Sequence, residues 1–527
     1  DKTTGRFNGE QKYGKLTVSA NMTYSISKTD KTLTSGGLWG SGGTGTMTAL
    51  YGWPLQEDMS HYLNDDGTKY RLFDGVWELA DDKENPYWII NKDKMYDKTH
   101  RFTGALSGNF KITDWWDVTA RFGYDNYTTD AYTYIAPGSV VKELYQNGRL
   151  SKSDYRYEYW SSNVMTNLHK TFGDFDLGLM LGTTAESTER LNQTHWGYNF
   201  TTPGTISFTN IAAGDQFFND GTTKKRLVGV YGEARASYKN LAYLTFTGRN
   251  DWSSTLPSWN RSYFYPSVSA SVILSEMFKL PECIDYLKVR GSWAMVGNDT
   301  DPYKLATMYH FWTSGDKLDA EGDKVNPGII KTYLDKTLPL ADLKPESTTS
   351  AEVGTELRMF NNRLSLDFTY YKSDTKDQIL SVNMPGSSGY TSKSINAGKI
   401  SSHGFELMIG GTPIRTKDWT WDVNLNWGLN RTKCVELDKD IKRFTLGSIR
   451  TGSVVVNEGE MFGDIVGKAY KRDANGNKIV DANGLPISES DKVIGNMLPK
   501  WTGSVGTTLR WKDLSLSALV DIRYDGD

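Results

Sequence analysis

Two segments of the sequence have the spacing of ligand-binding loops. Residues Gly40 to Gly45 fit the pattern G-x-G-x-x-G, with which a glycine-rich turn brings backbone N–H groups close to a dinucleotide pyrophosphate. That chemistry requires a buried strand before the turn and a helix after it, whereas these residues lie in a stretch rich in Gly, Ser and Thr. We therefore interpret the segment as a flexible outer loop.

The second segment, residues 473–481, resembles the first half of a calcium loop. Its Asp and Asn side chains could supply the oxygen ligands that Ca²⁺ prefers. However, Lys478 stands where such a loop needs Gly, and Gly484 stands where it needs Glu. A repeated Asp-Ala-Asn-Gly turn explains the pattern better, and calcium binding stays an open alternative.

Other residue types do not form a recognisable catalytic or metal-binding pattern. The six histidines never fall at H-x-H or H-x-x-x-H spacing, and Cys283 and Cys434 form no C-x-x-C pair. The sequence contains neither a G-x-S-x-G elbow nor a P-loop, and the loop carboxylates are best interpreted as a solvated surface. We therefore predict no catalytic residue, no metal ligand and no cofactor, and a protein that is not an enzyme.

Eight tryptophans in the predicted loops are the candidates for ligand binding. Their flat rings, with many tyrosines between them, could stack on sugar rings or on peptide side chains. The alternative is that they pack the loops against one another or against a partner, as aromatic anchors commonly do. The candidates are Trp39, Trp53, Trp77, Trp88, Trp196, Trp252, Trp259 and Trp312.

The elements that position these loops are predicted to be long β-strands. Leu16, Val18 and Ala20 alternate with Thr17 and Ser19, and the alternation continues to residue 26. Soluble strands usually have about five or six residues, whereas about 9–11 tilted residues cross a membrane. The length therefore favours a strand that spans a bilayer.

The same pattern recurs in pairs of segments joined by short turns. We predict sixteen strands: 5–12 with 16–26, 102–112 with 116–124, 160–170 with 175–185, 228–238 with 242–249, 264–274 with 287–296, 348–359 with 364–372, 402–411 with 419–430, and 499–511 with 514–523. Long connections separate the pairs, at 28–100, 128–158, 186–224, 250–262, 298–346, 374–400 and 432–498. Alternating short and long connections are typical of an outer-membrane barrel with short periplasmic turns and long extracellular loops.

A large soluble sandwich is the alternative to this barrel, because the alternation within any single strand looks the same in both. The placement of tryptophans distinguishes the two folds. Bilayers favour aromatic side chains at both water interfaces. Two such girdles are predicted, one beside the short turns and one where strands enter long loops; they comprise Trp115, Trp116, Trp419, Trp421 and Trp511, and Trp160, Trp427 and Trp501.

Composition excludes several other classes of protein. The 527 residues include 60 basic and 63 acidic side chains, so a net charge of -3 gives no sign of nucleic-acid binding. With 17 Trp, 30 Tyr and 20 Phe the chain is too aromatic to be disordered, and no apolar stretch is long enough for a membrane-spanning helix. Both ends of the predicted barrel emerge on the outer-loop side, from which we expect further strands and domains at both termini.

Several motifs resemble the barrel of SusC/RagA-type TonB-dependent transporters of Bacteroidetes. They are residues 250–255 (NDWSST), 260–271 (NRSYFYPSVSAS), 287–299 (LKVRGSWAMVGND), 343–354 (LKPESTTSAEVG), 360–364 (FNNRL), 396–400 (NAGKI) and 404–407 (GFEL). These motifs mark strands and turns, so no ligand-binding residue follows from them. The likeness extends over nearly the whole chain.

The resemblance implies a 22-stranded barrel, of which residues 1–527 would form a partial barrel domain without the N-terminal plug and the closing strands. It implies TonB-dependent import across the Gram-negative outer membrane, driven by the TonB-ExbB-ExbD complex through a segment that is missing here. A SusD-like surface lipoprotein would cap the barrel. We expect oligosaccharides as ligands, with peptides as the alternative; a surface-bound enzyme or adhesin on a barrel scaffold is the alternative of another class.

Overall fold

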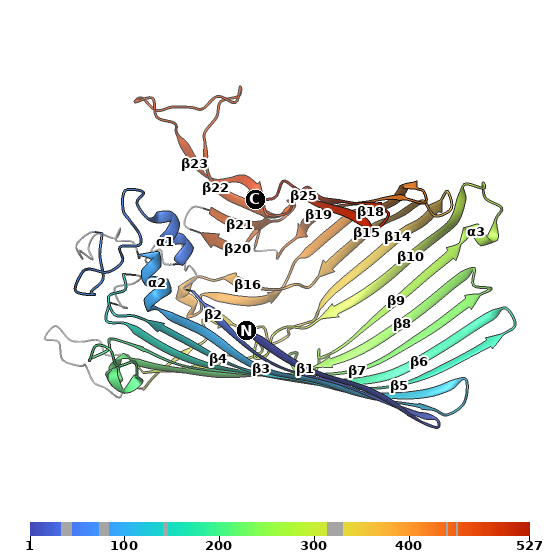
Figure 1. The fold of residues 1–527 in the computed structure, drawn as a ribbon, viewed down its shortest axis with the longest axis horizontal. Coiled ribbons are helices and arrows are strands. Elements are labelled where there is room, and N and C mark those ends of the chain that lie inside the picture. Colours follow the sequence, from blue (N-terminus) through green and yellow to red (C-terminus); the bar gives the residue numbers. More distant parts are fainter. Residues whose placement is uncertain (33–44, 73–83, 141–145, 314–329, 439–440, 450–451) are drawn as a thin grey trace.

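The computed structural model describes residues 1–32, 45–72, 84–140, 146–313, 330–438, 441–449 and 452–527. Sixteen strands form one antiparallel sheet, in which each strand pairs with its neighbours in chain order (Figure 1). The sheet consists of β1 (Lys2–Tyr13), β2 (Leu16–Lys31), β3 (Lys94–Lys111), β4 (Trp116–Ile135), β5 (Arg149–Phe172), β6 (Phe175–Tyr198), β7 (Gln216–Tyr238), β8 (Ala242–Ser253), β9 (Ser262–Ile273), β10 (Ile284–Asn298), β14 (Glu346–Met359), β15 (Leu364–Lys376), β18 (Lys399–Arg415), β19 (Trp419–Glu436), β24 (Trp501–Trp511) and β25 (Leu514–Tyr524).

The remaining elements belong to the connections between these strands. They are α1 (Thr46–Gly52), α2 (Pro86–Lys92) and α3 (Leu274–Met277), with 3₁₀ turns at Phe208–Asn210, Ala213–Asp215 and Gly386–Ser388. Three small sheets join β11 (Tyr309–Thr313) to β12 (Ile330–Leu334), β13 (Thr337–Leu338) and β16 (Ile379–Asn383) to β17 (Ser392–Asn396), and β20 (Arg443–Ile449), β21 (Gly452–Asn457), β22 (Phe462–Tyr470) and β23 (Ser488–Asn496) to one another. No helix among the described residues is long and apolar enough to cross a membrane.

Short turns and long connections alternate, as the sequence predicts. Gly173, with φ of 58°, turns β5 into β6, and Asn361 and Asn362 adopt positive φ between β14 and β15. Gly and Asn tolerate this left-handed conformation better than other residues, which explains why they occupy tight turns. All sixteen predicted strands of the sheet are confirmed.

The predicted connections are too long, because several strands run well beyond the length that a bilayer requires. β5 and β6 contain 24 residues each, and residues 199–215 alone connect β6 to β7, where the sequence predicts a connection over 186–224. Trp160 therefore lies in the middle of β5 and not where the strand enters a loop. The alternation of side chains continues past this point with polar residues, which conceals the strand from a search for apolar periodicity.

One face of the sheet carries large apolar side chains that no other layer of the described structure covers. On β6 the side chains of Leu177, Leu179 and Leu181 are 41%, 39% and 51% exposed, and Val228 and Val230 on β7 continue this face. A soluble sandwich would bury such residues against a second sheet. We call this side the apolar face and the other side the polar face.

Cross-strand register shows where the apolar face ends. Tyr124, Trp160 and Ser187 are directly paired on β4, β5 and β6, and we call them the boundary row. One step toward the short turns, Phe122 pairs with Ser162; one step toward the long connections, Asn126 pairs with Glu158. Aromatic side chains at this change from apolar to charged neighbours form the girdle of a bilayer interface.

Candidate functional site

The polar face of the sheet is lined by charged side chains that bond across strands. Arg101 on β3 donates two hydrogen bonds to Asp125 on β4, from Nε at 2.9 Å and from Nη2 at 2.6 Å. Two parallel N–H···O bonds fix the orientation of both groups, because the guanidinium and the carboxylate are both planar. This face is therefore an ordered, hydrophilic wall.

Glycines on this wall let long side chains cross a whole strand. Arg290 on β10 passes over Gly354 on β14 and donates to Asp367 on β15, at 2.9 and 2.6 Å. A Cβ at Gly354 would lie 2.9 Å from Nε of Arg290, so a larger residue would displace the arginine. Tyr231 crosses Gly182 in the same way and bonds the amide of Asn163 at 2.7 Å.

A pocket of about 460 Å³ opens on the polar face near the long connections. It is lined by residues of β6 to β10 and of the connection after β10, among them Arg190, Lys225, Asp251, Tyr263 and Asp299. Two of its carboxylates are already compensated. Arg249 donates to Asp251 at 2.9 Å, and Lys225 forms an ion pair with Asp299. The pocket thus offers polar groups of both signs to a ligand that passes along the wall.

Two of the candidate tryptophans are buried. Trp53 follows α1 and is 6% exposed, and Trp88 on α2 is 5% exposed. The ammonium group of Lys69 lies 4.8 Å from the centre of the Trp88 ring. Both rings pack within the connection between β2 and β3, so neither presents a flat surface to a ligand in this conformation.

Two other candidates lie on strands and not in loops, contrary to the prediction. Trp196 is part of β6, on the polar face, and stacks on Phe217 at 5.6 Å between ring centres. Trp252 is part of β8 and pairs with the exposed Val228, which places it on the apolar face. The polar-face position makes Trp196 the better placed of the two for a ligand.

Of the four remaining candidate tryptophans, two lie among the described residues and two do not. Trp259 is 69% exposed in the connection after β8, and its indole N–H donates to Asp342 at 2.9 Å. Trp312 lies on β11 and therefore on a strand. Trp39 and Trp77 lie outside the described residues. The structure thus brings no group of these eight tryptophans together in one described pocket, and their binding role stays a prediction.

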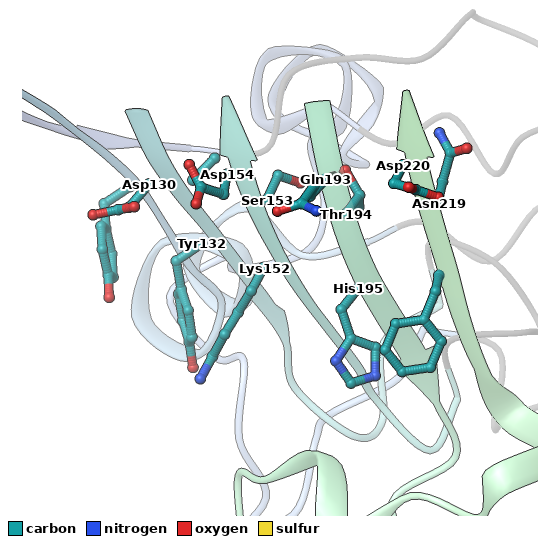
Figure 2. Close-up of a pocket in the computed structure, with 13 residues that line it drawn as sticks. Asp130, Tyr132, Lys152, Ser153, Asp154, Gln193, Thr194, His195, Asn219 and Asp220 are labelled. Atoms are coloured by element: carbon teal, nitrogen blue, oxygen red, sulfur yellow. Dashed lines mark hydrogen bonds between the residues drawn. The ribbon is translucent and has the colours of Figure 1, made fainter. Parts of the chain in front are cut away.

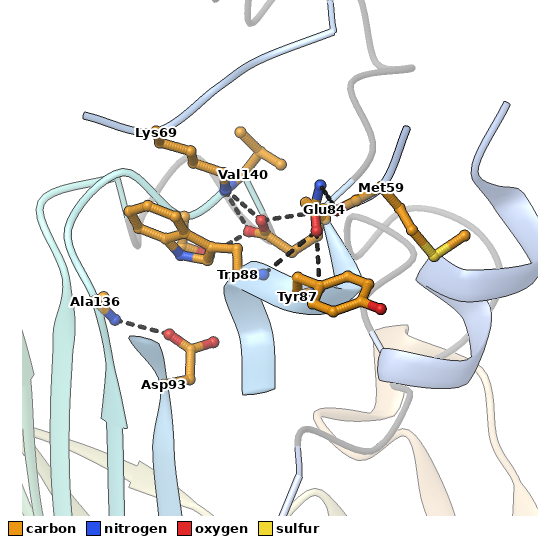
Figure 3. A network of polar contacts seen from close by, with 10 residues as sticks. Met59, Lys69, Glu84, Tyr87, Trp88, Asp93, Ala136 and Val140 are labelled. Atoms are coloured by element: carbon orange, nitrogen blue, oxygen red, sulfur yellow. Dashed lines mark hydrogen bonds and ion pairs between the residues drawn. The ribbon is translucent and has the colours of Figure 1, made fainter. Parts of the chain in front are cut away.

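A buried ion pair holds the connection between β2 and β3 (Figure 3). Lys69 and Glu84 form a salt bridge with side chains that are 5% and 0% exposed. The second oxygen of Glu84 accepts hydrogen bonds from Ser139 Oγ at 2.9 Å and from the Val140 N–H at 2.8 Å. Because Ser139 and Val140 follow β4, this network links the connection before β3 to the connection after β4.

Asn85 and Asp93 mark the two ends of α2 in the same network. The Asn85 side chain caps the helix by accepting from the Tyr87 N–H at 2.8 Å, with Pro86 at the first helical position. Asp93 accepts a hydrogen bond from the Ala136 N–H at 2.9 Å. Burial raises the pKa of Asp93 to about 7, and the negative charge of Glu84 adds to the effect. Sequence patterns could identify the cap but not this network, whose members are far apart in the chain.

The segment 473–481 forms turns, as predicted. Oδ1 of Asp473 accepts hydrogen bonds from the backbone N–H groups of Asn475 and Asn477, at 2.9 and 2.8 Å. Asp481 repeats the arrangement with Asn483. In the described part of the chain, no three His, Cys, Asp or Glu side chains are grouped as metal ligands. The two cysteines are free thiols.

A single antiparallel sheet with one exposed apolar face, an aromatic boundary and a hydrogen-bonded polar face is the wall of a transmembrane β-barrel. The apolar face contacts lipid, and the polar face encloses water. The chain belongs to the family described as TonB dependent receptor-like, beta-barrel, whose model matches residues 39–527. This is a family of outer-membrane receptors of Gram-negative bacteria and not of enzymes.

Individual relatives support the same family. The chain is 23% identical to TonB-dependent receptor P3 of Formosa agariphila over 520 residues, which cover 93% of this chain and 50% of that protein. It is 26% identical to TonB-dependent receptor SusC of Bacteroides thetaiotaomicron, over 67% of this chain and 35% of that protein. The chain spans about half the length of the first of these relatives.

The fold is also similar to that of a solved structure, the RagAB peptide transporter. The superposition has a TM-score of 0.79 at 19% identity and covers 99% of this chain and 57% of that chain. At this identity the likeness concerns the fold. Together with the family match and the SusC relative, this shared fold confirms the SusC/RagA-type barrel that the sequence motifs indicate.

Proposed function

We propose that residues 1–527 form part of the barrel of a TonB-dependent importer that takes up oligosaccharides across the outer membrane. The observation that supports this proposal most is the pairing of an exposed apolar face with an ordered polar wall, in a chain of the TonB-dependent receptor family. Charged groups fixed by cross-strand bonds keep a wide channel hydrated, and hydroxyl-rich ligands can exchange hydrogen bonds with them.

The partners follow from the same proposal. A SusD-like lipoprotein would close the outer mouth, where the long connections and the small sheets lie, and the TonB-ExbB-ExbD complex would supply energy from the periplasmic side. Exposed aromatic rings such as Trp259, together with Trp196 on the polar face, are the proposed first contacts for ligand. No covalent chemistry is involved.

Peptide import is the second candidate, and the fold similarity to the RagAB peptide transporter favours it. An uptake experiment with the full-length protein separates the two. A strain that lacks the gene and a complemented strain are each given labelled neutral oligosaccharides or labelled peptides of similar mass. Complementation that restores only oligosaccharide uptake supports the first candidate, and restoration of only peptide uptake supports the second.

A hydrolysis assay with the purified protein tests the alternative from another class. Cleavage of glycans by the purified barrel, without partners, would show that the protein acts as a surface enzyme. We expect intact glycans after incubation and uptake only in cells with an energised inner membrane.

A further inference from the structure

β3 to β7 continue beyond the boundary row and form a wall above the membrane. Asp130 follows Tyr124 by six residues on β4, which corresponds to about 20 Å along the strand at ~3.3 Å per residue. With a tilt of about 45°, Asp130 lies roughly 14 Å above the girdle, whereas the head-group layer adds only about 5–8 Å to the hydrocarbon core. The outer side of this wall therefore faces the surroundings of the cell and not the lumen.

Two cross-strand rows on this outer side contain carboxylates, an amide, aromatic rings and a lysine, in place of the aliphatic side chains that contact lipid lower on the same face. One row contains Asp130, Asp154, Gln193 and Asp220, which are paired in register on β4 to β7. The next row contains Tyr96, Tyr132, Lys152, His195 and Phe218, on β3 to β7. Figure 2 shows the carboxylates and amides along one line and the rings and Lys152 along the line beside it. Register places both rows on the same side of the sheet as Leu181 and Val228.

These rows line an open pocket of about 690 Å³, and all of its lining residues in the described part of the chain belong to β3 to β7. The connection between β6 and β7 folds over one side of the wall and orders the rings there. His195 is stacked between Phe208 and Phe218, with ring centres 3.5 and 3.9 Å away. Nε2 of His195 is 2.9 Å from the side-chain oxygen of Gln216, whose amide group donates to the Phe208 and Ile211 carbonyls.

At the other end of the pocket, Tyr96 and Tyr132 stack at 5.0 Å, while at the His195 end the ring of Phe218 is 73% exposed. The pocket thus combines flat apolar rings with carboxylates and amides, which can each bond more than one hydroxyl group. A pyranose ring has this combination of properties, with C–H groups on its faces and hydroxyl groups around its edge. Three carboxylates, set against Lys152 in the pocket and Arg156, which pairs with Asp154 at 3.5 Å, leave the site with a net negative charge, which disfavours phosphate, sulfate and uronic acids.

We propose that this outer pocket is a second carbohydrate-binding site, outside the transport path, for neutral or amino sugars. The proposal depends on the barrel orientation and not on import. Sugars that reach this height have two sources, free oligosaccharides and the glycan part of lipids in the outer leaflet. Such a site would hold glycans close to the mouth of the barrel or anchor the barrel among surface glycans.

Binding to the purified protein in detergent tests the proposal. The probes are a neutral linear hexasaccharide, a chitosan hexasaccharide as the amino-sugar form, a uronic-acid hexasaccharide, and detergent-dispersed lipopolysaccharide whose outer polysaccharide is neutral. Affinity is measured by calorimetry. The variants are Asp130→Asn with Asp154→Asn, and separately Phe218→Ala. The matched control is Glu158→Gln with Glu189→Gln. These two carboxylates are directly paired on β5 and β6, on the same face of the sheet, and Glu158 lies two register steps below Asp154; both are outside the pocket.

We expect at least one of three probes, the neutral hexasaccharide, the amino hexasaccharide or lipopolysaccharide, to bind wild type and the control with equal affinity. The same probe should bind both pocket variants at least tenfold more weakly. Binding of a free hexasaccharide identifies free glycans as the source, and binding of lipopolysaccharide alone identifies lipid-linked glycans. The proposal is overturned if none of these probes binds at millimolar concentration, if only the uronic-acid probe binds, or if the pocket variants bind like the control. Unchanged oligosaccharide uptake by cells with the pocket variants would place the site outside the transport path. If wild-type cells import no oligosaccharide at all, that result would refute the proposed function but not the outer binding site.

Discussion

Val423 and Asn424 are neighbours on β19 whose side chains point to opposite faces of the sheet. Val423 shares the apolar face with Trp421, Leu425 and Trp427, which are 37%, 40% and 38% exposed. The two tryptophans are six residues apart, about 20 Å along the strand at ~3.4 Å per residue, so Val423 lies near the middle of the apolar band. Val423→Arg therefore places a charge close to the bilayer midplane, at a cost of about 2–4 kcal/mol.

Asn424→Arg introduces the same side chain one residue further, on the polar face. Its direct neighbours on β18 and β24 are Gly410 and Gly506, which leave room for a longer side chain. We expect a change below about 0.5 kcal/mol, as for other surface substitutions. The assay is urea unfolding of both variants in lipid vesicles, compared with wild type. Equal destabilisation by the two substitutions would refute the assignment of the two faces.

Three further predictions concern the polar face and the connection between β2 and β3. Gly354→Ala should displace Arg290 and lower the free energy of unfolding by about 1 kcal/mol, since the ion pair between Arg290 and Asp367 is partly screened by water. Gly291→Ala is the control, because its Cβ would lie 3.6 Å from the nearest atom; it should cost less in the same unfolding assay. Lys69→Met leaves the buried Glu84 carboxylate without its ion-pair partner, so the region around α2 should lose about 3–5 kcal/mol of local stability. Amide hydrogen exchange measures this loss, and unchanged protection of α2 would contradict the stabilising role of the ion pair. The pKa of Asp93 rises from 3.8 to about 7 on folding, so the folded form binds more protons, and local stability around α2 should fall as the pH rises from about 4 to 7. Asp93→Asn should remove this pH dependence. An equal slope of stability against pH in wild type and variant would exclude Asp93 as its cause.

The strands of the sheet could be predicted because bilayer contact imposes a strict alternation on them. Residues 175–185 show it clearly, since Leu177, Leu179 and Leu181 must all face lipid. Above the boundary row this constraint ends, and charged residues such as Arg156 and Glu189 continue the same face of the sheet. For this reason the sequence predicts loops where the upper halves of β5 and β6 lie.

The candidate site was harder to predict because it depends on contacts between distant parts of the chain. Trp88 and Trp259 both lie in connections that the sequence predicts, yet the first is buried beside Lys69 and the second is exposed. Only tertiary packing distinguishes them. The crossing of Gly354 by Arg290 likewise becomes visible only when three strands are placed in register.

Accessibility of single cysteines along β6 tests most directly whether the apolar face contacts lipid. Cys283 and Cys434 are replaced by Ser, and positions 177 to 181 are changed to Cys one at a time, spin-labelled and reconstituted in vesicles. We predict that labels at 177, 179 and 181 collide mainly with oxygen dissolved in the bilayer, and labels at 178 and 180 mainly with a water-soluble nickel chelate. Labels at the odd positions that are shielded from both reagents, as between two packed sheets, would contradict the barrel.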